Sequence, residues 1–184
     1  MRKIIAAFNL TLDGFCDHTA INPDEEIHDH YSQLIRNSSL ALYGNTTFQL
    51  MKFWQELVAN PSGEKSMDEF ATVMDQIPKI VFSNQLKTTA ELAWESATLA
   101  SQSLDETVRD LKSQSAGDVL VGSRSLIVQL TNLHLIDEFQ FCIHPIIAGK
   151  GLPFFDQIPE KHDLQLKHTK TFGSGAVLLT YSST

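Results

Sequence analysis

The stretch DVLVGSRSLIVQLTNLHLIDEFQFCIHPIIAGKG, residues 118–151, carries the pattern that decides the fold of this chain. It begins with a short apolar run from Asp118 to Val121, typical of a buried strand, and Gly122 follows as a turn. Residues 123–133 then repeat apolar side chains at helical spacing, and residues 139–143 alternate with the period of two that marks a strand. The stretch therefore predicts a strand, a glycine turn, a helix and a second strand.

The same order of elements occurs nearer the N-terminus. Residues 4–12 form a short apolar segment that ends in an Asp-Gly pair, which indicates a buried first strand followed by a turn. A helix is predicted over residues 23–37, with Asn22 as its N-cap. Residues 40–43 predict a second buried strand, which leads through Gly44 into another helix start.

The rest of the chain continues this alternation. The remaining expected elements are a short helix around residues 48–51, a loop over 55–66, helices over 68–76 and 104–112, a strand over 80–82, and strands 164–166 and 176–181 paired as a hairpin. Strands that alternate with helices and end in a hairpin predict an α/β fold: a mixed, mostly parallel sheet flanked by helices, with a C-terminal antiparallel hairpin. We expect residues 1–184 to form a single domain.

The composition narrows the classes of partner. The 184 residues are 42% hydrophobic and 20% charged, with a formal net charge of -8, and this acidic balance argues against nucleic acid or an anionic membrane. The two cysteines, Cys16 and Cys142, lie far apart with no Cys-x-x-Cys spacing, so neither a disulfide framework nor a zinc site is suggested. His28 and His30 are two residues apart on a predicted helix and point in different directions, so no metal site is expected. Without a long apolar run, the expected location is the cytoplasm.

Polar residues that could bind a ligand follow the predicted strands. Gly44 and Gly122 each connect a strand to a helix, where free backbone N–H groups and the positive helix end can face a phosphate. Hydroxyl groups near these turns add hydrogen-bond donors, at Thr46, Thr47, Ser123 and Ser125. Ser83 and Asn84 end another strand, and ligands of open α/β sheets bind at such ends. The alternative is that these residues only cap helices and allow close packing.

Several segments together resemble a known family. The sequence is similar to dihydrofolate reductases, and especially to the reductase domain of riboflavin-biosynthesis enzymes. The similarity covers nearly the whole chain and is carried by Leu12-Asp13-Gly14-Phe15, Gly44-x-Thr46-Thr47-Phe48, Lys79-Ile80-Val81-Phe82-Ser83, and the block from Leu120 through Gly151 with Phe154-Phe155.

This resemblance implies a dihydrofolate reductase-like fold and NADPH as the cofactor. The dinucleotide would be bound by the turn at Gly44 and Asn45, by Ser83-Asn84 near the adenosine ribose, and by the Gly122-Ser123 turn at the pyrophosphate. The nicotinamide would lie against the first strand near Ala7. Asn45 stands where the family usually has Arg, and Asn84 stands where the family often has a basic residue. NADH is therefore the alternative, and Arg124 or Lys87 are the cations that would compensate.

The resemblance also implies an acid on the first helix that faces the substrate. Helical phase places Asp24 within about 60° of the core-facing stripe and Asp29 nearly opposite, so Asp24 is preferred. An acid in the first turn of a helix is also favoured by the helix dipole alone, and that role stays open. Asp13 is a second candidate acid, with an ordinary turn residue as its alternative role.

The expected activity is the transfer of a hydride from a nicotinamide dinucleotide to a small heterocycle. The activity implied by the resemblance is that of 5-amino-6-(5-phosphoribosylamino)uracil reductase, although no basic cluster for a ribose phosphate is evident. Dihydrofolate reductase activity and a non-catalytic nucleotide-binding module are the alternatives. Related reductase domains are often dimers, so a homodimer is expected.

Overall fold

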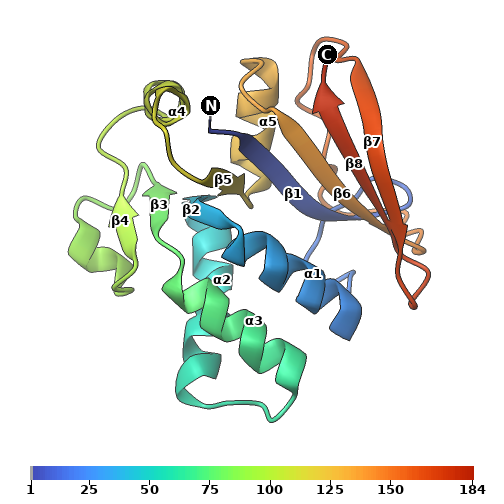
Figure 1. The fold of residues 1–184 in the computed structure, drawn as a ribbon, viewed down its shortest axis with the longest axis horizontal. Helices are drawn as coiled ribbons and strands as arrows, with labels where there is room; N and C mark the ends of the chain where they lie inside the picture. The colour runs from blue at the N-terminus through green and yellow to red at the C-terminus, as the bar shows by residue number, and fades with distance from the viewer. Residues whose placement is uncertain (1) are drawn as a thin grey trace.

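The computed structural model describes residues 2–184 and contains one eight-stranded sheet with the strand order β4-β3-β2-β5-β1-β6-β8-β7 (Figure 1). The strands are β1 (Ile4–Thr11), β2 (Ser38–Gly44), β3 (Lys79–Phe82), β4 (Ala97–Leu99), β5 (Asp118–Val121), β6 (Glu138–His144), β7 (Leu164–Thr171) and β8 (Val177–Ser183). The helices are α1 (Glu25–Arg36), α2 (Asn45–Ala59), α3 (Lys65–Gln76), the 3₁₀ helix η1 (Thr89–Leu92), α4 (Leu104–Ser113) and α5 (Arg124–Asn132).

The directions of the strands confirm the predicted fold class. The strands from β4 across to β6 pair in parallel, whereas β8 pairs antiparallel with both β6 and β7. The result is a mixed, mostly parallel sheet that ends in an antiparallel hairpin. The parallel strands share one carboxyl edge, where a ligand of such a sheet is expected.

Helices cover both faces of the sheet, and the side chains of β1 point alternately toward one set of helices and the other. Ile4 and Ala6 belong to the core cluster that includes side chains of α4 and α5, and Ile5 and Ala7 belong to the cluster that includes those of α1 and α3. In Figure 1, α4 and α5 lie above the sheet, and α1, α2 and α3 lie below it. All four of these β1 side chains are at most 7% exposed, so the strand is buried on both faces.

The start of α1 differs from the prediction. The N-cap is Asp24 instead of Asn22, and the helix begins at Glu25. The Asp24 carboxylate accepts a hydrogen bond of 2.9 Å from the backbone N–H of Ile27, which satisfies a free donor of the first turn. Asp24 therefore lies at the helix boundary, and the helical phase assigned to it from sequence does not apply.

Other helix and strand boundaries also differ from the predicted ones. The predicted loop over 55–66 is wrong for residues 55–59 and 65–66, because α2 continues to Ala59, before the Pro-Ser-Gly break, and residues 65–66 belong to α3. The helix predicted over 68–76 begins earlier, at Lys65. The sequence analysis missed η1 and β4, which are four and three residues long and too short to show a period. Every residue of β7 is exposed, so its alternating leucines do not mark a buried face.

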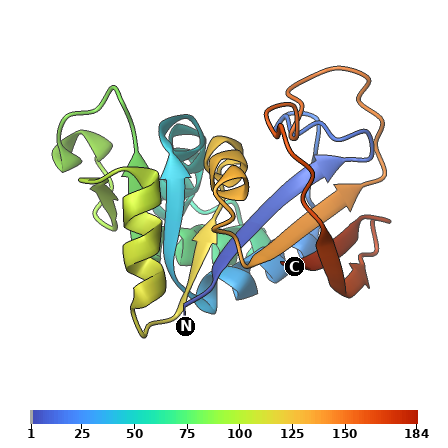
Figure 2. The same cartoon turned by 90° about the horizontal axis from the view of Figure 1, so that it is seen from above.

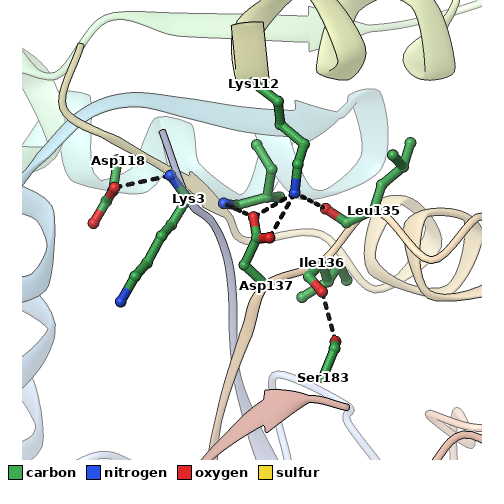
Figure 3. A network of polar contacts seen from close by, with 8 residues as sticks. Lys3, Lys112, Asp118, Leu135, Ile136, Asp137 and Ser183 are labelled. Atoms are coloured by element: carbon green, nitrogen blue, oxygen red, sulfur yellow. Dashed lines mark hydrogen bonds and ion pairs between the residues drawn. The ribbon is translucent and has the colours of Figure 1, made fainter. Parts of the chain in front are cut away.

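A polar network fixes the amino edge of the sheet, at the opposite end from the expected ligand site (Figure 3). The Asp137 carboxylate accepts hydrogen bonds from the backbone N–H of Ile4 and from the Lys112 Nζ, at 2.8 and 2.6 Å. Lys112 also donates to the backbone carbonyl of Leu135. The pair thus ties α4 to the starts of β1 and β6, which gives Asp137 a structural role.

Candidate active site

Two helix N-termini meet at the carboxyl edge of the sheet. Gly44 ends β2 and Gly122 follows β5, and these strands are neighbours. The backbone N–H of Gly44 donates a 2.9 Å hydrogen bond to the Ser123 Oγ, which joins the two turns directly. Within residues 2–184, no side chain caps the first turn of α2 or of α5. The two helices lie on opposite faces of the sheet, and in Figure 2, seen from above, both lie at the end toward which β2 and β5 point, so their first turns flank one edge.

Both glycines allow close packing at this edge. A Cβ on Gly122 would lie 2.8 Å from the Cε1 of Tyr43, which is closer than packed carbon atoms approach. A Cβ on Gly44 would lie 3.2 Å from the Oγ of Ser125. The packing role considered from sequence is therefore real for Gly122, and it is compatible with a backbone that a ligand can approach.

The hydroxyl groups of the two turns differ in accessibility. Ser123 is 0% exposed and its Oγ is engaged by Gly44, so its side chain supports the turn from inside. Thr46 and Ser125 are exposed, and Thr47 is half-buried. Among these hydroxyls, Thr46 and Ser125 are the ones that are open to a ligand.

Ser83 and Asn84 lie beside the same edge, because β3 pairs with β2 and Gly44 is opposite Phe82. The Ser83 Oγ accepts hydrogen bonds from the backbone N–H groups of residues 85 and 86, which shapes the turn. Asn45 reaches the same turn through a 3.4 Å hydrogen bond from its Nδ2 to the side chain of Gln85. The three polar segments predicted from sequence are thus brought together.

The two cations considered from sequence have different surroundings. Arg124 donates from its Nε to the backbone carbonyl of Pro153 at 2.7 Å and forms an ion pair with Asp156. Lys87 is exposed, and its Nζ contacts the carbonyl of Asn84 at 3.5 Å. Lys87 is therefore the less constrained of the two cations and lies beside Ser83-Asn84.

A polar cluster that the sequence analysis missed lies on the Ala7 face of β1. The Asn9 Oδ1 accepts from the Tyr31 hydroxyl at 3.2 Å and contacts the His144 Nε2 at 3.0 Å. Burial is the main cause of the lowered pKa of His144. The one signal in the sequence was a polar Asn9 inside an apolar strand.

Asp24 is close enough to His144 to feel its charge, and it also lines a cleft at the start of α1. Burial is the largest influence on its pKa and would raise it. The hydrogen bonds from Ile27 and Ser174, together with the nearby His144, outweigh burial and leave the pKa below its ordinary value. Asp24 is therefore a carboxylate at neutral pH, and it both caps α1 and lines the cleft.

Asp13 holds two loops together. Its carboxylate accepts hydrogen bonds from the Thr11 hydroxyl at 2.7 Å and from the backbone N–H groups of Ala148 and Gly149 at 3.1 and 2.7 Å. These bonds, led by that of Thr11, lower the pKa of Asp13 to about 2. The carboxylate thus joins the turn after β1 to the loop after β6.

The cleft beside Asp24 has a volume of about 610 Å³. It lies between the start of α1, the second half of α2 and the start of α3, on the sheet face that carries Ala7. Its lining includes Asp24, Glu25, His28, Phe53, Trp54, Glu64 and Lys65. Concave sites of this size with a few polar groups are typical of small-molecule binding.

The family follows from comparison with known proteins. The profile of the RibD C-terminal domain matches residues 2–178. The chain belongs to the RibD C-terminal domain family. The uncharacterized protein YyaP of Bacillus subtilis (strain 168) is 31% identical over 188 residues, which cover 98% of this chain and 94% of YyaP.

Solved structures of RibD-like proteins share the fold. A putative riboflavin biosynthesis protein from Shewanella sp. PV-4 aligns over 99% of both chains with a TM-score of 0.74 and 17% identity. Acinetobacter baumannii RibD aligns with a TM-score of 0.69 and 14% identity, and this chain spans 58% of that protein. These matches confirm the dihydrofolate reductase-like fold that the resemblance implied.

Two further findings concern membrane-spanning helices and metal sites among the described residues. No helix within residues 2–184 is long and apolar enough to cross a membrane. Over the same range, no group of three or more His, Cys, Asp or Glu side chains is arranged to hold a metal ion.

Proposed function

We propose that this RibD C-terminal domain protein is an NAD(P)H-dependent reductase that acts on a small heterocycle. The observation that carries the proposal is the pair of uncapped helix N-termini joined by the Gly44–Ser123 hydrogen bond. They follow β2 and β5, and β5 pairs with β1; a cleft of ligand size lies among α1, α2 and α3, the helices on the Ala7 face of the sheet. The arrangement suits a dinucleotide that runs along the carboxyl edge of the sheet.

The residues at this edge fit the dinucleotide chemically. A pyrophosphate would lie against the N–H groups at the starts of α2 and α5, with the exposed hydroxyls of Thr46 and Ser125 as further donors. The adenosine ribose would lie at Ser83-Asn84. When bound near Ala7, the nicotinamide supplies the hydride. The chain itself binds and orients the two reactants and excludes water from them.

Asp24 is the proposed proton source for the substrate. Its carboxylate lines the cleft and is held in place by the backbone N–H of Ile27. Its lowered pKa keeps the Asp24 side chain mostly in the carboxylate form at neutral pH. Proton transfer from its carboxyl group would therefore become faster as the pH falls. Asp13, whose carboxylate is already engaged three times, is better explained as a support for the loops around the site.

NADPH is the proposed cofactor, with NADH as the alternative. Lys87 supports a preference for the 2′-phosphate, because its ammonium group is exposed beside Asn84. Lys87→Gln should therefore reduce the ratio of NADPH to NADH affinity by about tenfold, the scale of one lost charge-assisted contact. Lys167→Gln on β7 is the matched control. An unchanged ratio in Lys87→Gln would remove this residue from the cofactor site.

A homodimer is a further proposal. The edge strand β7 is exposed along its whole length and carries Leu164 and Leu166, which are 36% and 51% exposed. An exposed edge of this kind can pair with a second chain. Light scattering should give the mass of a dimer, and Leu166→Lys should shift the protein toward the monomer.

The proposal as a whole is tested by binding and turnover on the same preparation. NADPH at 100 times its dissociation constant should stabilise the native state by about 2.7 kcal/mol and raise the thermal midpoint. Oxidation of NADPH should then be followed with phosphoribosylaminouracil and dihydrofolate substrates. Thr46→Val should weaken NADPH binding, whereas the matched change Thr169→Val on β7 should not.

The outcomes separate the alternatives. Binding of a dinucleotide without turnover of any heterocycle would favour the non-catalytic nucleotide-binding module. Turnover of dihydrofolate alone would favour dihydrofolate reductase activity. No thermal shift with NADPH or NADH at millimolar concentration would refute the proposed function.

A further inference from the structure

The charges that line the 610 Å³ cleft are mostly negative. Asp24, Glu25 and Glu64 contribute three carboxylates, and Lys65 is the one Lys or Arg among the described residues of the lining. The Lys65 ammonium group also lies 3.8 Å from the carboxylate of Glu69, so its charge is partly balanced outside the cleft. The cleft therefore has an excess of negative charge.

His28 does not reverse this balance. It is partly buried in the wall of the cleft, and burial is the largest influence on its pKa. The carboxylates of Asp24, Asp29 and Glu64 act to raise the pKa, but it remains below its ordinary value. The imidazole is therefore mainly neutral at neutral pH.

Aromatic rings form the other part of the lining. The rings of His28 and Trp54 are 5.8 Å apart, and those of Phe53 and Trp54 are 5.1 Å apart. Phe53 is 51% exposed although it is a large apolar side chain, so it presents its ring at the cleft. Such walls suit a flat ring, which can pack against aromatic side chains.

We infer that this cleft selects a planar, unphosphorylated heterocycle that is neutral or positively charged. A phosphate group is normally bound by arginine, lysine or clustered N–H donors, and here it would face three carboxylates instead. The inference rests on the proposed function, because it assigns the cleft to the heterocycle that the reductase acts on. It makes a substrate with a ribose phosphate the disfavoured class for this chain.

Three probes test the inference through binding alone. Uridine is neutral, uridine 5′-monophosphate adds the phosphate to the same ring and sugar, and 2,4-diaminopyrimidine offers a planar ring that takes up a proton. Their affinities are measured calorimetrically, with and without NADPH. We expect uridine and 2,4-diaminopyrimidine each to bind at least about tenfold more tightly than uridine 5′-monophosphate, because like charges in a partly enclosed site repel.

Matched variants identify the cause. The double variant Glu25→Gln and Glu64→Gln keeps the size of both side chains and removes two charges, so the discrimination against the phosphate should fall by about tenfold. Both residues are exposed, and Glu64 makes no side-chain cap bond, so the fold should be retained. Glu160→Gln, an exposed position in the loop between β6 and β7, is the control and should leave the discrimination unchanged.

Each result has one meaning for the inference. Equal or tighter binding of uridine 5′-monophosphate, no binding of any probe at millimolar concentration, or unchanged discrimination in the double variant would overturn it. The NADPH thermal shift is recorded separately. A normal NADPH shift together with a preference for the phosphate would reject only the cleft inference, whereas the absence of dinucleotide binding would reject the proposed function.

Discussion

Replacing Lys79 with Met is expected to change how the stability of the fold depends on pH. Lys79 is 1% exposed at the start of β3. Its Nζ donates to the backbone carbonyls of Asp75 and Ile77 and to the hydroxyl of Ser96, at 3.2, 2.8 and 2.7 Å, and lies 4.2 Å from the centre of the Trp94 ring. These contacts join the end of α3 to β3, the strand that leads to the proposed ribose site.

The magnitude follows from the lowered pKa of Lys79. Burial lowers it from 10.5 to about 8, and the charge of Asp75 offsets only part of that effect. Between these two values the unfolded chain holds the proton and the folded chain releases it, so the stability contributed by this group rises with pH. Over the range from about pH 7 to pH 9.5 the linkage relation gives a gain of about 2 kcal/mol.

The assay is urea unfolding of the wild type and of Lys79→Met at a series of pH values. Met is similar in length to Lys but does not titrate. The hydrogen bonds that are lost with Lys79 therefore change the free energy of unfolding by an amount that does not depend on pH. The difference in free energy of unfolding, wild type minus variant, should increase by about 2 kcal/mol across this range. Other titrating groups cancel in that difference. A difference that stays flat, or that falls as the pH rises, would refute the reasoning.

Three further changes test the site and its supports. Asp24→Asn should keep the helix cap and most of the stability but lower turnover by about 10²-fold at neutral pH. The rate of the wild type should rise as the pH falls toward the lowered pKa of Asp24. An Asp24→Asn variant with full turnover would exclude Asp24 as the proton source. Gly122→Ala should cost about 1–3 kcal/mol through its contact with Tyr43, and adding Tyr43→Ala should cost less than the sum of the two changes in urea unfolding. Asp13→Asn should be less stable than the wild type near neutral pH. Because the pKa of Asp13 is lowered from 3.8 to about 2, that deficit should shrink as the pH falls through this interval, and a deficit independent of pH would contradict the role of the carboxylate.

The site was predicted less completely than the fold. The sequence analysis placed Gly44, Ser83 and Gly122 at strand ends, and the structure brings these positions to one edge because the strands are parallel neighbours. It did not find the cluster of Asn9 and His144, whose side chains meet across 135 residues of sequence. No local pattern marks such a contact, because it depends on the pairing of β1 with β6.

Local chemistry determined the class of fold and the approximate positions of most elements, since burial imposes a period on strands and helices and glycine marks their turns. Tertiary structure decided which polar groups remain available. Ser123, which the sequence offers as a ligand donor, is buried against Gly44, and Arg124 is engaged by Pro153 and Asp156. It also decided that Asp24 caps α1 and that carboxylates from α1 and from the residue before α3 line one cleft. These properties depend on distances between segments that are remote in the chain, and such distances exist only once the helices pack on the sheet.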